Sequence, residues 1–191
     1  VSAVLTDGSR EVLIATEQGQ SIRFPEEQVR PMGRSTMGVK AIDVADDDQV
    51  VGFTVTDDAR KHVLAVCERG FGKRTDIEEF RTQNRGGKGI ILIDASDRNG
   101  PVVDVKLVCD EDEVMFITDR GQMLRTRISE IRETGRNAQG VKLMSLEEGE
   151  RIVAVERLAE AAEDPAADGA DGTSEAPPSD TTGGDPPPDL N

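Results

Sequence analysis

Residues 114–141 decide the fold, and they read VMFITDRGQMLRTRISEIRETGRNAQGV. The same pattern occurs at residues 63–90 and at residues 12–39, without a gap, at a spacing of 51 residues. Identical register over three copies indicates one structural unit that is built three times. The residues that recur are mostly glycine, apolar residues and arginine, and the arginines are Arg23, Arg74 and Arg125, then Arg30, Arg81 and Arg132, then Arg34, Arg85 and Arg136.

Each repeat opens with a predicted hairpin. An apolar run rich in β-branched residues is followed by two polar residues and a glycine, and a second strand comes next. Glycine adopts positive φ at little cost, so this pattern favours a tight turn between two strands. The first strands are predicted at residues 12–15, 63–66 and 114–117, and return strands at residues 21–24 and 123–126.

Two further strands are expected in each repeat. A Gly- and Arg-rich loop precedes a third strand, predicted at residues 39–42 and 141–144, and an acidic turn leads to a fourth, predicted at residues 50–53, 102–105 and 152–155. Four short strands in a unit of this length are typical of a propeller-type blade. WD and kelch propellers rely on Trp, which this chain lacks. Helical repeats need longer amphipathic runs, and a generic β-sandwich does not explain the gap-free register.

The sequence thus predicts an all-β fold for residues 1–158, with blades at about 8–58, 59–109 and 110–158. Residues 159–191 differ, because they contain no Lys or Arg but nine acids and six of the nine prolines. Such a segment has too little apolar surface to offset its ordering entropy, which predicts a disordered acidic tail. The alternative for this tail is a solubilising segment without further function.

The charge is unevenly distributed along the chain. Of the net charge of −15, the tail supplies −9, which leaves −6 for residues 1–158. This net charge alone argues against nucleic acid, but binding depends on local clustering of charge. Cys67 and Cys109 form no CxxC pair, and with no signal peptide they predict a reducing cytoplasm. No apolar run has the length of a membrane span, and the start at Val1 leads us to expect a piece of a longer protein.

Three loops carry the candidate binding site. Residues 32–40 read MGRSTMGVK, residues 83–89 read QNRGGKG and residues 134–142 read TGRNAQGVK. Glycines expose backbone N–H groups, Arg and Lys neutralise phosphates, and no acid falls inside any of the loops. A P-loop is excluded, because no Ser or Thr follows Lys88. In the structural alternative, the glycines only allow tight turns and the arginines pair with Glu26, Glu27, Glu78, Glu79 or Glu130.

Residues 83–89 resemble the Gln-Arg-Arg-Gly-Gly-Lys-Gly box of the DNA gyrase A family, with Asn84 in place of an Arg. The resemblance to the C-terminal domain of that family covers about residues 8–158, and it includes the segments 72–75, 117–119, 135–141 and 141–143. It implies a β-pinwheel, a disc of usually six four-stranded blades that exchange strands with their neighbours. Three repeats before an acidic tail resemble the last three blades, whereas the family's functional box belongs to the first.

The resemblance also implies a function. This part of DNA gyrase A would bind and wrap double-stranded DNA, without sequence specificity, in support of ATP-dependent negative supercoiling by a type II topoisomerase. The implied partners are the rest of the gyrase A chain and gyrase B, in an A2B2 heterotetramer of the bacterial cytoplasm and nucleoid. This chain has no Tyr for a covalent DNA link and no Walker loop, so catalysis, ATP and Mg are expected only in the complete enzyme. No metal or cofactor is expected here, and the lone His62 is expected to be packed or exposed rather than catalytic.

The predicted site consists of cations in or beside the loops. The DNA-binding residues are predicted to be Arg23, Arg34, Lys40, Lys73, Arg74, Arg85, Lys88, Arg125, Arg136 and Lys142. The box-like loop consists of Gln83, Asn84, Arg85, Gly86, Gly87, Lys88 and Gly89. Two alternatives stay open: the C-terminal domain of the corresponding topoisomerase IV protein, and a propeller-like module that binds proteins. Salt-dependent DNA binding separates the second alternative from DNA wrapping.

Overall fold

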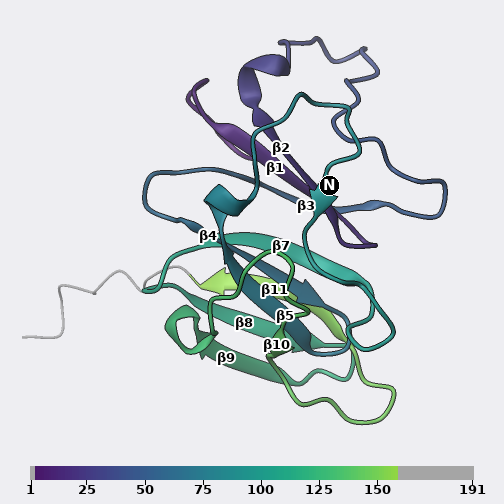
Figure 1. Ribbon diagram of the computed structural model, residues 1–191, viewed down its shortest axis with the longest axis vertical. Helices are drawn as coiled ribbons and strands as arrows, with labels where there is room; N and C mark the ends of the chain where they lie inside the picture. Colours follow the sequence, from purple (N-terminus) through teal and green to yellow (C-terminus); the bar gives the residue numbers. More distant parts are fainter. Residues whose placement is uncertain (1–2, 159–191) are drawn as a thin grey trace, which may run out of the picture. The chain divides into compact units, whose positions relative to one another are not determined.

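The computed structural model describes residues 3–158, and the predicted tail at residues 159–191 lies outside this part. As predicted, the described chain is all β apart from three short 3-10 turns (Figure 1), and it has no helix long and apolar enough to cross a membrane. The strands are β1 (Glu11–Thr16), β2 (Gln20–Pro25), β3 (Val50–Val55), β4 (His62–Cys67), β5 (Phe71–Asp76), β6 (Ile90–Ile91), β7 (Val102–Val108), β8 (Glu113–Thr118), β9 (Met123–Arg127), β10 (Val141–Lys142) and β11 (Ile152–Leu158). The 3-10 turns are η1 (Glu26–Gln28), η2 (Ile77–Glu79) and η3 (Ile128–Glu130).

The predicted hairpins are confirmed in all three repeats. β1 pairs antiparallel with β2, β4 with β5, and β8 with β9. The turn glycines Gly19, Gly70 and Gly121 have φ of 81°, 80° and 82°, a region that glycine enters without the steric cost of a side chain. The predicted fourth strands are β3, β7 and β11, which pair antiparallel with β1, β4 and β8.

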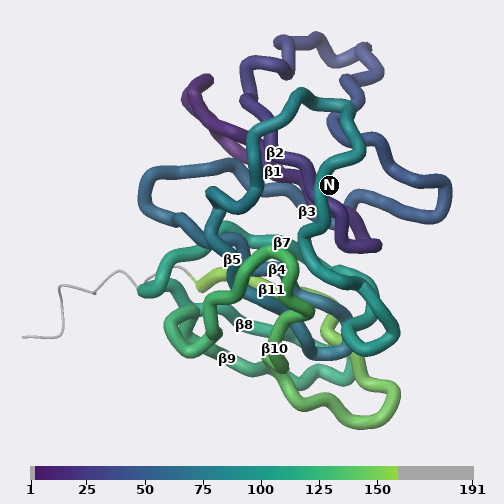
Figure 2. Tube along the Cα trace, in the orientation of Figure 1, coloured from purple at the N-terminus to yellow at the C-terminus, as the bar shows by residue number. Residues whose placement is uncertain are grey.

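The third strands leave their own repeat. β6, from the second repeat, pairs with β2 of the first, and β10, from the third repeat, pairs with β5 of the second. The sheet orders are therefore β3-β1-β2-β6, β10-β5-β4-β7 and β11-β8-β9. Figure 2 shows the chain running from β5 to the hairpin of the first repeat before it returns to β7. This is the strand exchange that the resemblance implies.

The prediction of a strand at residues 39–42 is wrong, because these residues lie in an irregular segment. The predicted strand at residues 141–144 shortens to the two residues of β10. The reason is the exchange itself, since a third strand pairs with the hairpin of the preceding repeat and no described hairpin precedes residues 39–42. For the same reason the third sheet has three strands, with β9 at its edge.

The two larger clusters of the apolar core join neighbouring repeats. One cluster joins Leu13 of β1 to Val63 of β4 and to Phe80, which follows η2. A second cluster joins Leu64 of β4 to Phe116 of β8. Full burial of a side chain such as Phe80 contributes roughly 2–3 kcal/mol. Each repeat therefore gains much of its stability from the next repeat, as expected of a repeat protein.

Candidate nucleic-acid interface

The second and third Gly/Arg loops lie against the preceding repeat. Gly89 and Gly140 have φ of 75° and 92°. A Cβ at Gly89 would lie 2.2 Å from the Ser21 carbonyl oxygen, and one at Gly140 would lie 2.6 Å from that of Gly72. These distances are too short for any side chain, so glycine is required where the loop becomes the donated strand. The loops are thereby fixed at the junctions between repeats.

Arg85 and Arg136 act as equivalent clasps across two junctions. The Arg85 side chain donates to the Gln28 carbonyl oxygen and to the Lys40 carbonyl oxygen, both at 2.9 Å, and its backbone N–H donates to Gln28 Oε1 at 2.9 Å. One repeat further on, the Arg136 backbone N–H donates to Glu79 Oε2 at 2.6 Å, and its guanidinium donates to the Ile91 carbonyl oxygen at 3.3 Å. Both predicted site arginines are half-buried, and they hold the loop to the preceding repeat.

The box-like loop is tied down by its backbone. The Gln83 N–H donates to the Arg23 carbonyl oxygen at 2.7 Å, and the Gly86 N–H donates to the Ala41 carbonyl oxygen at 2.6 Å. The Gly87 carbonyl oxygen accepts from the Asp43 N–H at 2.8 Å. Gly86 also has a positive φ of 82°. The backbone groups of this loop therefore bond to the first repeat.

Three of the arginines predicted to bind DNA form ion pairs with acidic side chains. Arg23 is 11% exposed, lies 2.5 Å from Glu11 and 3.3 Å from Glu78, and donates to the Ile77 carbonyl oxygen at 2.8 Å. Arg74 is buried and pairs with Asp110. Arg125 is exposed and pairs with Glu113, and this hydrogen bond lowers the pKa of the Glu113 carboxyl. Arginines at these positions therefore pair with acids, although only Glu78 is one of the partners that the structural alternative named.

Lys73 is a buried cation whose ammonium group holds the third loop in place. Its Nζ donates to the Gly135 carbonyl oxygen at 3.2 Å and to that of Arg136, so it holds the third loop. Burial lowers the pKa of Lys73 to about 8, and the nearby Glu79 carboxylate opposes this shift. Lys73 has no exposed surface, so a contact with DNA would need rearrangement of the junction.

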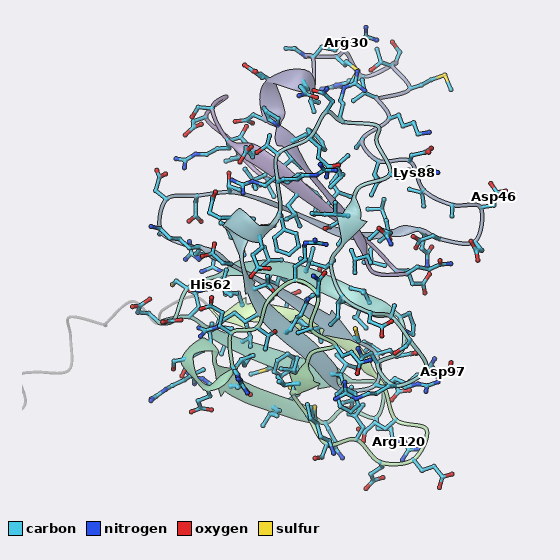
Figure 3. The ribbon with its side chains drawn as sticks, viewed as in Figure 1. Arg30, Asp46, His62, Lys88, Asp97 and Arg120 are labelled. Carbon is cyan, nitrogen blue, oxygen red and sulfur yellow. The ribbon has the colours of Figure 1, made fainter. Side chains whose placement is uncertain are left out.

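Six loop cations are exposed and have no carboxylate partner in residues 3–158, and they are Arg30, Arg34, Arg81, Lys88, Arg132 and Lys142. Lys40, by contrast, pairs with Asp43 and lowers the pKa of that carboxyl. Arg30 and Lys88 point away from the ribbon (Figure 3). The predicted site set omits Arg30, Arg81 and Arg132, although their 51-residue spacing is the signal that identifies them.

The free cations are concentrated in the loops. Of the 23 Lys and Arg residues, all within the described range, 11 pair with a carboxylate there. Nine of the 23 Lys and Arg residues lie in segments 29–42, 80–91 and 131–142. Among these nine, only Lys40 has a carboxylate partner. In the rest of the described chain, most cations are neutralised locally. The loop segments are therefore the most electropositive feature of a chain whose net charge is negative.

The titratable groups of residues 3–158 bear on two kinds of site, a metal centre and a reactive thiol. The described residues contain no cluster of His, Cys, Asp and Glu side chains that would hold a metal ion. Burial raises the pKa of the Cys67 thiol to about 12, so this sulfur is a poor nucleophile. His62 begins β4 as expected, and its Nε2 lies 3.1 Å from Glu133 across the junction to the third repeat. His62 is thus a partly buried residue at the junction between two repeats.

Repeats that exchange third strands and carry basic loops define a propeller-like repeat domain of the pinwheel type. The family model described as "DNA gyrase C-terminal domain, beta-propeller" matches residues 10–57, 61–109 and 112–159. The chain therefore belongs to the DNA gyrase C-terminal domain family.

Several curated relatives are DNA gyrase A proteins. The protein of Salmonella typhimurium is 43% identical over 169 residues, which are 88% of this chain and 19% of the relative. That of Haloquadratum walsbyi is 41% identical over 157 residues, and that of Staphylococcus aureus 40% over 165 residues. These two alignments cover 82% and 86% of this chain, and 18% and 19% of the relatives. The chain thus spans about a fifth of the length of these relatives.

Solved structures agree with the fold. A DNA gyrase A C-terminal domain superimposes with a TM-score of 0.76 at 25% identity, over 81% of this chain and 52% of that one. The C-terminal domain of a DNA topoisomerase IV gives the same TM-score of 0.76 at 22% identity, over 81% of this chain and 48% of that one. The second likeness concerns the fold alone.

Proposed function

We propose that this chain binds double-stranded DNA along its Gly/Arg loops without reading the base sequence. The observation that carries this proposal is the concentration of cations without carboxylate partners in three loops of an otherwise acidic chain. Arginine and lysine neutralise phosphates and release counterions, which gives affinity that does not depend on sequence. Phosphate contacts position the duplex without specifying a site.

Three of these cations have equivalent positions in successive repeats, which would form a row from one repeat to the next. Arg30, Arg81 and Arg132 follow the apolar residue after each 3-10 turn, and the same type of junction separates successive repeats. A row that continues from one repeat to the next suits a duplex that bends along the protein, because each added contact offsets part of the bending cost. Arg85 and Arg136 serve this surface indirectly, since they hold the loops in place.

We further propose that the chain is part of a DNA gyrase A protein. The curated relatives at 40–43% identity support gyrase over topoisomerase IV. In this proposal, wrapping supports ATP-dependent negative supercoiling by a type II topoisomerase of the bacterial cytoplasm and nucleoid. The rest of gyrase A, together with gyrase B, completes an A2B2 enzyme that supplies the cleavage chemistry, ATP and Mg. No catalytic step and no membrane contact is assigned to this chain.

The test of DNA binding replaces free cations and compares them with paired ones. The triple variant Arg30→Ala, Arg81→Ala and Arg132→Ala removes exposed cations without a carboxylate partner among the described residues. The matched control is the triple variant in which Ala replaces Arg120, Arg127 and Arg151. These three arginines are exposed but paired with carboxylates. Fluorescence anisotropy over a salt series should show a salt slope smaller by roughly 3 for the triple variant, since each phosphate contact contributes about 0.9.

Two outcomes would overturn the proposal. Binding that does not depend on salt would favour the protein-interaction module, and equal losses in both triple variants would mean that the loops have no special role. Wrapping is tested separately by sealing nicked plasmid on the bound protein, which should shift the linking number in one direction. Binding without such a shift would limit the proposal to DNA binding alone.

A further inference from the structure

A few free cations lie outside the three loop segments. Four such residues have no carboxylate partner in the described part of the chain, and they are Lys61, Arg69, Lys73 and Arg98. Lys73 is buried, and Lys61 precedes β4 at the end of the strand away from the β4–β5 turn. Arg69 and Arg98, by contrast, are exposed and lie beside one side chain, Phe71 of β5.

Phe71 connects these two arginines to the third loop. The Arg98 guanidinium lies over the Phe71 ring, with Cζ 4.4 Å from the ring centroid. Lys142, the last residue of the third loop, is opposite Phe71 in the ladder between β5 and β10. Arg69, Phe71 and Lys142 line one cavity of about 530 Å³ beside the β4–β5 turn. We call Arg69, Phe71, Arg98 and Lys142 the turn patch.

Both arginines of the turn patch keep donors for a further partner. A guanidinium that stacks on an aromatic ring uses its face, so the N–H groups at its edge stay available for a phosphate. Arg98 is held in this way by Phe71. Arg69 donates to the Asp97 carbonyl oxygen, which orients its guanidinium without neutralising its charge.

The acids of the same cavity are already engaged. Glu68 lies 3.0 Å from Arg151, and Glu147 lies 2.9 Å from Arg120. Glu150 is buried. Glu68 and Glu147 therefore offset other arginines, and the three cations of the turn patch keep their charge for a partner.

The first junction has no such patch. The repeat equivalents of the four patch residues are Gln18, Gln20, Asp47 and Ile91. Three of them line a cavity of about 240 Å³ at that junction, so the two sites correspond in position. One acid and no cation stand there, against three cations and no acid in the turn patch. Equivalent backbones therefore carry opposite charge at the two junctions.

Asn99 fixes the turn patch to the third loop. This residue is fully buried, and its Nδ2 donates to the Asp94 carbonyl oxygen at 2.7 Å and to the Gln139 carbonyl oxygen at 2.8 Å. The Asn99 carbonyl oxygen in turn accepts from the Arg69 N–H at 3.0 Å. Since Gln139 belongs to the third loop, both patch arginines are held at a set position relative to that loop.

We propose that the turn patch binds phosphates of the duplex that contacts the third loop, so that the DNA surface extends onto the turn end of the second repeat. This inference rests on the proposed DNA binding, and it adds Arg69 and Arg98 to the residues that contact DNA. Their charge is complementary to phosphate and continuous with that of the third loop. Because the first junction lacks the patch, the duplex is held more firmly beside the third loop than beside the second.

The first test removes the two new cations together. Arg69→Gln with Arg98→Gln should lower the salt slope of DNA binding by about 1.8, since each phosphate contact contributes about 0.9. The control is Lys61→Gln with Arg127→Gln, which removes the same charge at exposed positions away from the β4–β5 and β8–β9 turns. Its slope should equal that of the parent. Fluorescence anisotropy over a salt series measures both.

The outcomes separate this inference from the proposed function. If the parent shows no salt-dependent DNA binding, the proposed function itself is wrong. If the parent binds and the Arg69 and Arg98 variant keeps its slope, only the turn patch is overturned. Equal losses in this variant and in its control would show that net charge alone matters, which also contradicts the patch.

The second test concerns the aromatic ring. Phe71→Leu keeps an apolar side chain and all charges but removes the surface on which Arg98 stacks, so the affinity should fall roughly two- to fivefold at an unchanged salt slope. Gln20→Leu, at the equivalent position of the first junction, should bind like the parent. Affinity of Phe71→Leu equal to that of the parent would contradict the role of the ring.

The third test locates the duplex. Asp46 and Asp97 are repeat equivalents, and both are exposed and point away from the ribbon (Figure 3). Asp97→Cys or Asp46→Cys, in a Cys109→Ser background in which Cys67 is buried, can each carry a tethered iron chelate that cuts nearby DNA through hydroxyl radicals. Cleavage should be several-fold stronger from position 97. Equal cleavage from the two positions would overturn the proposal.

Discussion

Lys73 shows how one repeat position can change its role. It stands where the first and third repeats carry Ile22 and Leu124, so its aliphatic stem fills an apolar position between repeats. Its charge is retained because two carbonyl oxygens of the third loop accept its hydrogen bonds. The same burial makes the charge costly, which is why the pKa falls to about 8 from the ordinary 10.5.

Replacing Lys73 with Met should remove a pH dependence of stability. Between about pH 8 and 10.5 the unfolded chain binds this proton more fully than the folded chain, so the free energy of unfolding of the parent rises with pH. Lys73→Met leaves the carbonyl oxygens of Gly135 and Arg136 without their donor, so at pH 7 it should be less stable than the parent by about 1–3 kcal/mol. The parent should gain about 3 kcal/mol relative to Lys73→Met by pH 10.5. Urea unfolding across this range measures the difference, in which the contribution of Cys67 cancels.

The control for this experiment is Lys142→Met, at an exposed lysine of the third loop. Its stability curve should run parallel to that of the parent throughout the range. If the curve of Lys73→Met also runs parallel to that of the parent, the buried lysine keeps its ordinary proton affinity and burial does not lower its pKa.

Among the elements, the loops divide their cations between two tasks. Arg85 and Lys88 lie three residues apart in one box-like loop. Arg85 bonds to two carbonyl oxygens of the first repeat, whereas Lys88 is exposed and has no carboxylate partner in the described chain. The first residue therefore belongs to the junction, and the second belongs to the surface proposed to meet DNA.

Stability and DNA binding should separate at these two positions. Arg85→Ala leaves the carbonyl oxygens of Gln28 and Lys40 without their donors and should lower the free energy of unfolding by about 2 kcal/mol. Lys88→Ala should leave stability within about 0.5 kcal/mol and lower the salt slope of DNA binding by about 0.9. Thermal unfolding and anisotropy on both variants measure the four quantities. A stability loss of equal size in Lys88→Ala would contradict this division.

The sequence predicts the hairpins because their signals are local. The apolar run at residues 12–15 and the glycine at position 19 lie within a few residues of each other, and both strands are found as expected. The strand expected at residues 39–42 fails because its partner is another repeat, which no local pattern reports. The contacts of the arginines with other repeats escape the sequence for the same reason. The acceptors of Arg85 lie in the preceding repeat, and Arg23 meets Glu78 of the following repeat by tertiary contact.

For the whole molecule, the net negative charge is divided between the repeats and residues 159–191. The repeats carry −6 and the acidic segment carries −9, although all of the Lys and Arg residues lie in the repeats. Fifteen net negative charges oppose the approach of a polyanion, while the loop cations favour it locally. The acidic segment therefore competes with DNA for the loop cations in our hypothesis.

Deleting residues 159–191 should strengthen DNA binding at low salt by roughly tenfold, and the gain should vanish as salt screens the charges. Anisotropy titrations at several ionic strengths measure this change. The matched control keeps the length of the segment and replaces its nine acids with Asn and Gln. This neutralised protein should bind DNA as tightly as the deletion variant. If both the deletion variant and the neutralised protein bind DNA with the affinity of the parent, the hypothesis is wrong.

The backward donation of third strands also sets the order in which the chain acquires structure during synthesis. The sheet that begins at Glu11 is not complete until Ile91 has left the ribosome, and the sheet of β4 and β5 waits for Lys142. Each repeat is therefore finished by the one translated after it, so native structure follows elongation with a lag of about one repeat. Premature termination within a repeat costs the preceding one its last strand, which exposes an edge to neighbouring nascent chains.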